Sequence, residues 1–169
     1  SSGYYSTIGG GETNQISGGT HSFIGGGFEN TITGRYSTVG GGYRNNGTGD
    51  GSTSSGGYMN TSSGYYSTIG GGFTNVASGD RSVVAGGAYN TTSGKYSSII
   101  GGIDNTVSSY GEINGGLYST TASGNATTWV GTNRLFNIGN GTTVSNRSNA
   151  FTILKNGLAT LPSVTNALI

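Results

Sequence analysis

The hydrophobic residues of this chain recur at a spacing of about fifteen positions, which is neither a helical nor a simple strand interval. Glycine-rich triplets set the register: they begin at positions 9, 25, 40, 55, 70, 85, 100 and 114, so that successive copies lie 16, 15, 15, 15, 15, 15 and 14 residues apart. A β-branched apolar side chain, with one polar exception, precedes each triplet: Ile8, Ile24, Val39, Ser54, Ile69, Val84, Ile99 and Ile113. A periodicity this regular indicates a repeat protein.

Two further columns of the repeat have their own chemistry. The position three residues after the start of the triplet is mostly aromatic or apolar: Glu12, Phe28, Tyr43, Tyr58, Phe73, Ala88, Ile103 and Leu117. The position five residues after it holds asparagine until the last copy, which has Ser119: Asn14, Asn30, Asn45, Asn60, Asn75, Asn90 and Asn105. A Ser-Gly or Thr-Gly pair, such as Ser78-Gly79, completes the unit.

A unit of about fifteen residues is too short for a helical hairpin or a propeller blade, and it suits one coil of a parallel β-solenoid. The segment 66–69 alternates like a strand, which predicts that Ser67 and Ile69 face inward while Tyr66 and Thr68 face outward. The glycine triplets and the segment 75–79 supply the turns, since glycine permits positive φ and a corner asparagine tolerates the left-handed region.

Stacked coils place equivalent residues about 4.8 Å apart. The asparagine column is therefore predicted to form a ladder of hydrogen-bonded side-chain amides. We expect an all-β fold, a parallel β-roll or β-solenoid of about eight coils over residues 1–124. Its interior is thin, because each coil offers only about three apolar positions and glycine-rich backbone is costly to order. Association of several chains around a common axis would supply a second layer, although the sequence does not count the subunits.

The unit from Tyr66 to Gly79 resembles the head repeat of trimeric autotransporter adhesins, the YadA-like heads. The resemblance covers roughly three-quarters of the chain, which departs from the family in its glycine triplet, its regular asparagine and one more residue per coil. It implies a left-handed β-roll and a homotrimer.

The period stops after Gly124, and we expect residues 125–169 to form a short β-rich neck that caps the repeats. Segments 127–130 and 135–138 are predicted to be strands, and 150–161 a hairpin with a two-residue Asn156-Gly157 turn. Trp129 is expected to seal the last coil. The stretches 136–141 and 148–157 resemble neck segments of phage tail fibres and related bacterial surface proteins.

The composition of the chain limits the classes of binding partner that can be expected. The chain has 36 Gly among 169 residues, no Cys and a formal net charge of +1. The near-neutral charge gives no reason to expect nucleic acid, and no apolar run is long enough for direct membrane insertion. Since the sequence begins in mid-pattern, we expect it to be a piece of a longer chain.

The sequence favours no catalytic residue, metal site or cofactor. His21, the sole histidine, lies in a column of tyrosines with no carboxylate behind it, as a Ser-His-Asp arrangement would need. Asp50 and Asp80 share a column two coils apart, about 10 Å by the coil spacing, near the upper limit for an inverting glycosidase pair. The interpretation that we favour is that the acids pair with charges one coil away: Asp50 with Arg35, Asp80 with Lys95, and Glu29 with Arg44.

The outward tyrosines Tyr5, Tyr36, Tyr66 and Tyr96 are the candidate ligand contacts, since rings in a row can stack on sugars, although they could equally be structural ladders. We expect an extracellular attachment segment, on a bacterial cell or a virion, that binds a surface glycan or protein receptor. The alternative is a passive spacer whose binding tip lies elsewhere in the fibre. A polysaccharide-cleaving spike and an ice-binding face are less favoured; the threonine column that suggests ice binding, Thr7, Thr38, Thr53 and Thr68, is interrupted by Phe23, Val83 and Ser98.

Overall fold

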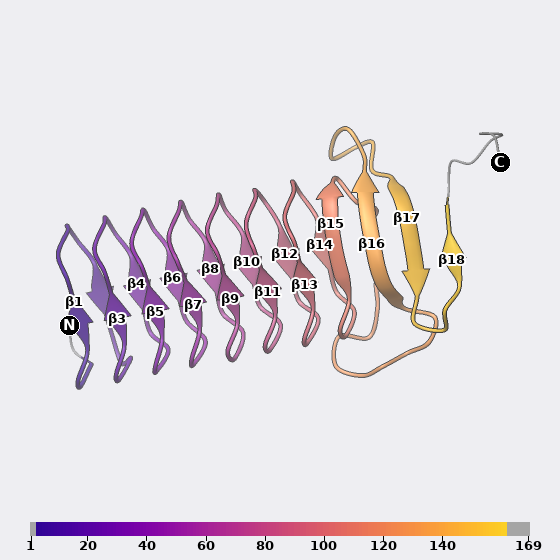
Figure 1. Cartoon of the computed structure of the whole chain (residues 1–169). Helices are drawn as coiled ribbons and strands as arrows, with labels where there is room; N and C mark the ends of the chain where they lie inside the picture. Colours follow the sequence, from indigo (N-terminus) through magenta and orange to yellow (C-terminus); the bar gives the residue numbers. More distant parts are fainter. Residues whose placement is uncertain (1–2, 162–169) are drawn as a thin grey trace.

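A computed structural model describes residues 3–161 and shows a rod of stacked coils that ends in a small antiparallel extension (Figure 1). The described residues contain strands and turns but no helix, and therefore no helix that could cross a membrane. The predicted all-β parallel β-solenoid is confirmed. Within residues 3–161, its coils supply eight strands to one sheet and seven to the other, which makes seven complete turns.

The two sheets of the solenoid run along the rod and consist mostly of two-residue strands paired in parallel. The first contains β1 (Thr7–Ile8), β3 (Phe23–Ile24), β5 (Thr38–Val39), β7 (Thr53–Ser54), β9 (Thr68–Ile69), β11 (Val83–Val84), β13 (Ser98–Ile99) and β15 (Ile113–Leu117). The second contains β2 (Gln15–Ile16), β4 (Thr31–Ile32), β6 (Asn46–Gly47), β8 (Thr61–Ser62), β10 (Val76–Ala77), β12 (Thr91–Thr92) and β14 (Thr106–Val107).

The core lies between these sheets and receives inward side chains from both of them. Strand alternation places the second residue of each short strand inside, as predicted for Ile69, and Ser67 is also fully buried. The apolar core falls into two clusters, Ile16, Ile24, Ile32 and Val39 in one, and Ile69, Ala77, Val84, Ile99 and Val107 in the other. Gly47, Ser54 and Ser62 occupy the inward positions between them, so the middle of the rod has little apolar filling.

The asparagine column forms a hydrogen-bonded ladder along the rod. The backbone N–H of Asn60 donates to Asn45 Oδ1 at 3.0 Å, and Asn60 Nδ2 donates to the carbonyls of Gly56 at 2.9 Å and Gly72 at 3.0 Å. Asn60 Oδ1 in turn accepts the backbone N–H of Asn75 at 3.0 Å. Each buried side-chain amide thus forms hydrogen bonds with backbone groups of its own turn and of both neighbouring coils.

One expectation about the corners is wrong. The ladder asparagines are not in the left-handed region; the residue before each of them is, for example Thr74 with φ 52°. Apart from Gly18, with φ 82°, the glycines of the Ser-Gly and Thr-Gly pairs are not there either. Gly49 and its equivalents are required by close packing, because a Cβ on Gly49 would lie 2.7 Å from the Gly64 carbonyl carbon.

The last coil is shifted by one residue relative to the repeat read from the sequence. Ile99 pairs with Asn114, so Asn114 is the buried residue and Ile113 is exposed, contrary to the expectation that Ile113 continues the apolar column. The coil regains the common register by Leu117, which bridges to Ile103. The missing residue has therefore been lost from the glycine turn and not from the strand.

The C-terminal segment extends the first sheet. Strand β16 (Arg134–Asn140) pairs in parallel with β15, β17 (Asn149–Leu154) pairs antiparallel with β16, and β18 (Ala159–Thr160) completes the edge. The predicted hairpin is present, but its loop is longer than two residues: Gly157 N–H bonds to Leu154 O, and Gly157 has φ 87°. This is a type I turn followed by a left-handed glycine.

Two smaller expectations about this segment are wrong. Residues 127–130 form no strand, because the Asn125 side chain accepts the backbone N–H groups of Thr127 and Thr128 in a local turn. Trp129 does not seal the coil, since more than half of its surface is exposed.

Candidate functional site

The non-glycine residues with positive φ occupy only two positions of the coil, one at each edge of the rod. At the first edge they are Tyr5, His21, Tyr36, Tyr66, Arg81 and Tyr96; at the second they are Thr13, Glu29, Arg44, Met59, Thr74, Tyr89, Asp104 and Tyr118. We call these the tyrosine edge and the glycine edge, the latter because it contains the glycine triplets. This geometry could not be predicted from the sequence, because the residue types at these positions are so varied.

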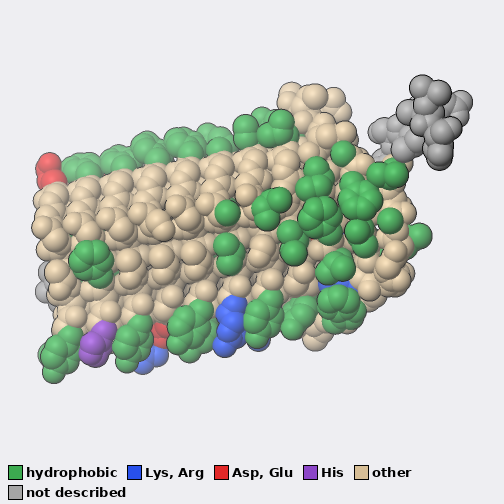
Figure 2. All heavy atoms as spheres, viewed as in Figure 1, with side chains coloured by type: hydrophobic (Ala, Val, Ile, Leu, Met, Phe, Trp, Pro, Cys, Tyr) green, Lys and Arg blue, Asp and Glu red, His purple; other side chains and the backbone are tan. Residues whose placement is uncertain are grey.

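The two edges lie at opposite ends of the strands, since the chain turns at one edge to enter the second sheet and at the other to return. Figure 2 shows the same division: a hydrophobic ridge follows one border of the rod, and mixed aromatic and charged side chains follow the other. A side chain on a left-handed corner points away from the sheets, so each coil displays one such side chain at either edge, except where Gly51 and Gly111 occupy the corner of the tyrosine edge. Equivalent positions repeat at about 4.8 Å.

The four predicted tyrosines all lie on the tyrosine edge, but they do not form one continuous column. Near the N-terminus, the His21 ring stacks on Tyr5 at 5.0 Å and on Tyr36 at 5.3 Å between ring centroids. The stack ends at Gly51, whose missing side chain leaves the space that the Tyr66 ring fills.

A second group on this edge is built around a cation. The Arg81 guanidinium lies 6.0 Å from the Tyr66 ring centroid and 5.6 Å from that of Tyr96. Tyr65 and Tyr110 pack edge-on against Tyr66 and Tyr96, with centroid distances of 4.3 and 5.5 Å. Arg81 was not among the residues predicted from the sequence, yet it links two of them.

The hydrophobic ridge of Figure 2 belongs to the glycine edge. Phe28, Tyr43, Tyr58 and Phe73 stack in order, with centroid distances of 5.6, 4.8 and 4.9 Å. Because each interior ring already has a neighbour on both faces, this column resembles a structural ladder more than a platform for a ligand.

The charged residues show mixed agreement with the predicted pairs. Arg35 Nη2 lies 2.6 Å from Asp50 Oδ2, and the side chains of Arg44 and Glu29 also pair. The hydrogen bond from Arg35 lowers the pKa of Asp50, so that carboxylate is held ionised and is poorly suited to act as a general acid. Asp80 and Lys95 form no ion pair in the described structure; Lys95 Nζ instead lies 5.4 Å from the Tyr96 ring.

Two further ion pairs, not expected from the sequence, tie the C-terminal segment to the last coils. Arg134 Nε lies 2.9 Å from Glu112 Oε1, and both side chains are almost fully buried. Arg147 Nη2 lies 2.8 Å from Asp104 Oδ1. Glu112 occupies the position of the buried serines of earlier coils, such as Ser97, and burial raises the pKa of its carboxyl group.

The remaining candidates are placed as follows. Within residues 3–161, no three acidic or histidine side chains are grouped closely enough to hold a metal ion. The threonine column of Thr7, Thr38, Thr53 and Thr68 lies on the outer face of the first sheet, where exposed Phe23 and Val83 interrupt it. In comparisons with known proteins, no family model and no curated protein matches the chain.

Proposed function

We propose that this chain is a segment of an extracellular, homotrimeric attachment fibre, carried by a bacterial cell or a virion, that binds a surface glycan or protein receptor without catalysis. The observation that carries the proposal is the display of outward side chains at the tyrosine edge, in every coil except those of Gly51 and Gly111, repeated along the rod. Repeated weak contacts at a fixed spacing gain strength from multivalency, which does not require a deep pocket.

The composition of the tyrosine edge supports binding rather than a purely structural role. Tyr36 and Tyr66 are 62% and 52% exposed, although a tyrosine ring would normally bury much of its surface. Their backbone is left-handed, a conformation that costs a non-glycine residue about 1 kcal/mol or more. Glycine would avoid that cost, as Gly51 does in the same column. Binding of a partner to the ring would offset the conformational cost of placing a tyrosine at a strained, exposed corner.

The trimer is part of the proposal and is supported by the thin core. Each coil buries few apolar side chains between the sheets, and apolar residues on the outside, such as Ile100 at 60% exposure, remain in contact with water in an isolated chain. Packing of copies around an axis would cover part of this surface. Light scattering coupled to size-exclusion chromatography would test the subunit number.

Binding is tested by replacing the predicted contacts without disturbing the corners. Asparagine tolerates the left-handed region, so changing Tyr5, Tyr36, Tyr66 and Tyr96 together to Asn removes the rings and keeps the backbone. We expect binding to a glycan array or to immobilised receptor surfaces to fall by about a hundredfold or more. The control changes Thr13 and Thr74 to Asn, at the same kind of corner on the glycine edge, and should leave this binding unchanged.

The outcomes separate the candidate functions. If the unmodified chain binds nothing across the array, the passive spacer replaces the attachment segment. Polysaccharide turnover that disappears in Asp50→Asn would instead indicate an enzyme.

A further inference from the structure

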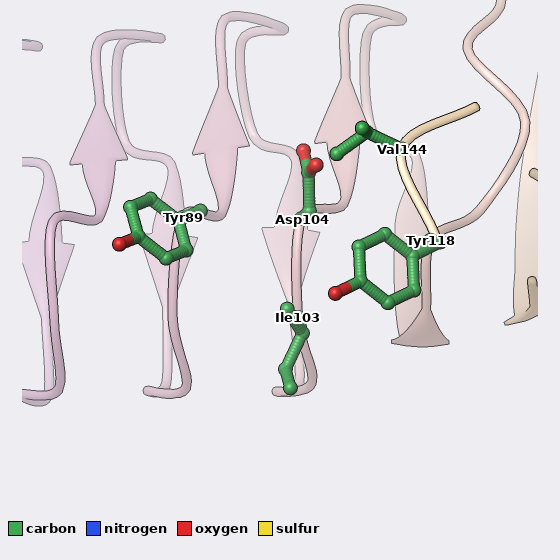
Figure 3. Close-up of a pocket in the computed structure, with 5 residues that line it drawn as sticks. All are labelled: Tyr89, Ile103, Asp104, Tyr118 and Val144. Carbon is green, nitrogen blue, oxygen red and sulfur yellow. The ribbon is translucent and has the colours of Figure 1, made fainter. Parts of the chain in front are cut away.

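A hollow of about 330 Å³ lies where the last coils meet the C-terminal segment. It is lined by Tyr89, Ile103, Asp104, Tyr118 and Val144 (Figure 3). The first four come from three successive coils of the glycine edge, and Val144 comes from the loop between β16 and β17. The volume is at the lower end of the range for small-molecule sites.

The two tyrosines flank the hollow. Tyr89 and Tyr118 are equivalent residues two coils apart, so their backbones are separated by about 10 Å. In Figure 3 the faces of both tyrosine rings are turned toward the viewer. Ile103 lies below the space between the two rings, and Asp104 lies above it. Tyr89 packs against Phe73 at 72° and not face to face, so it does not continue the stacked ladder of the glycine edge. Tyr89 is 52% exposed, and its ring is available at the hollow.

The carboxylate above the rings is held in place from the C-terminal segment. Arg147 Nη2 pairs with Asp104 Oδ1 at 2.8 Å, and Arg147 Nη1 donates to the backbone carbonyls of Asp104 at 2.7 Å and Ser119 at 3.2 Å. Asp104 Oδ2 takes part in none of the hydrogen bonds of the described structure. A fixed acceptor therefore stands beside two aromatic rings, and the guanidinium balances its charge.

We infer that this hollow is a binding site for a short, neutral oligosaccharide. Sugar rings present C–H faces that pack on aromatic rings, and their hydroxyl groups donate to a carboxylate oxygen. Tyr89 and Tyr118 supply two platforms far enough apart for more than one sugar unit, Ile103 and Val144 supply apolar walls, and Asp104 Oδ2 supplies the acceptor. Since Asp104 and Arg147 compensate each other, the site has no net charge that would select an acidic sugar.

This site differs from the repeated contacts of the tyrosine edge, which lies on the other side of the rod. It also depends on the fold of the C-terminal segment, because both Arg147 and Val144 come from there. A binding site here would occur once in each chain, whereas the contacts of the tyrosine edge repeat with every few coils. The two can therefore succeed or fail independently.

The experiment is an NMR titration of the isotope-labelled chain with maltohexaose, cellohexaose and, as the acidic comparison, hexagalacturonate. We expect a neutral hexasaccharide to shift the backbone amides of residues 103–105 and 117–119. Tyr118→Asn and Tyr89→Asn remove a ring while keeping a residue that tolerates the left-handed corner, and each should weaken binding about tenfold. Tyr118→Phe should retain it, and Thr13→Asn, at a left-handed corner of the glycine edge that does not line the hollow, is the control without effect.

Three results would overturn the inference: no shift at these amides with either neutral sugar at millimolar concentration, equal affinity in both Asn variants and the unmodified chain, or tighter binding of hexagalacturonate. Shifts confined to the tyrosine edge would refute this site while supporting the attachment function. Asp104→Asn provides a second measurement, since it keeps the shape of the side chain but should weaken binding if the carboxylate accepts sugar hydroxyls.

Discussion

Two glycines of the same coil should respond in opposite ways to the same substitution. Gly47 and Gly49 are both buried, neither has a left-handed φ, and they are separated by Thr48 alone. A Cβ added to Gly47 would lie 3.4 Å from Ile32 Cγ1 and 3.6 Å from Val39 Cγ2, which are ordinary contacts. A Cβ added to Gly49 would lie 2.7 Å from Ser63 O and closer still to Gly64 O.

The magnitudes follow from these contacts. Alanine lowers the conformational entropy of the unfolded chain, which stabilises a protein by about 0.4–1 kcal/mol at either position. At Gly47 the new methyl group also adds buried apolar surface to a part of the core that has little of it, which contributes about 0.8 kcal/mol. Gly47→Ala should therefore stabilise the fold by roughly 1–2 kcal/mol. At Gly49 the overlap forces two coils apart, and overpacking costs about 1–3 kcal/mol or more.

The assay is thermal and urea unfolding followed by far-ultraviolet circular dichroism, at one protein concentration because oligomerisation shifts the midpoint. For a chain of this size 1 kcal/mol corresponds to about 2–4 °C, so Gly47→Ala should raise Tm by roughly 2–8 °C. Gly49→Ala should lower it. The reasoning is refuted if Gly47→Ala lowers Tm or if Gly49→Ala leaves it unchanged. In either case the effect of the substitution on Tm would not depend on the space around the glycine.

Three further predictions concern the ladder, the corners and the charges. Asn60→Leu should lower the free energy of unfolding by at least about 3 kcal/mol in urea titrations, because it leaves several buried partners unsatisfied; an unchanged midpoint would show that the ladder is dispensable. Thr74→Asn should raise the free energy of unfolding by about 1 kcal/mol, because a β-branched residue is poorly accommodated at φ 52°, and a loss of stability would contradict the strain. For pH dependence, Arg35 lowers the pKa of Asp50, so the contribution of Asp50 is present above the unfolded pKa of about 3.9 and is lost as the pH falls. Burial raises the pKa of Glu112, so its contribution is present below about pH 4.3 and is lost as the pH rises through the folded pKa. As the pH rises from 3 to 7, the unfolding midpoint of Asp50→Asn should therefore fall relative to that of the unmodified chain. The midpoint of Glu112→Gln should rise relative to it.

Periodicity alone specified much of this fold. In a parallel solenoid equal positions of successive coils meet, so a column in the aligned sequence becomes a line of neighbours in space. That is why the inward placement of Ile69, the asparagine ladder through Asn60 and the Arg35–Asp50 pair could all be predicted from spacing. The same reasoning placed Tyr66 and its equivalents together on one edge.

Features that depend on backbone geometry or on aperiodic sequence became evident only in the folded chain. The left-handed corners at Tyr66 and Thr74 arise because a short coil must reverse direction within a few residues, whichever side chain stands there. The burial of Asn114 in place of Ile113 depends on where a single residue was lost from a turn. The Asp104–Arg147 pair joins residues 43 positions apart. No repeat relates these two residues, so their meeting, and the hollow beside them, is fixed only when the C-terminal segment folds back on the last coil.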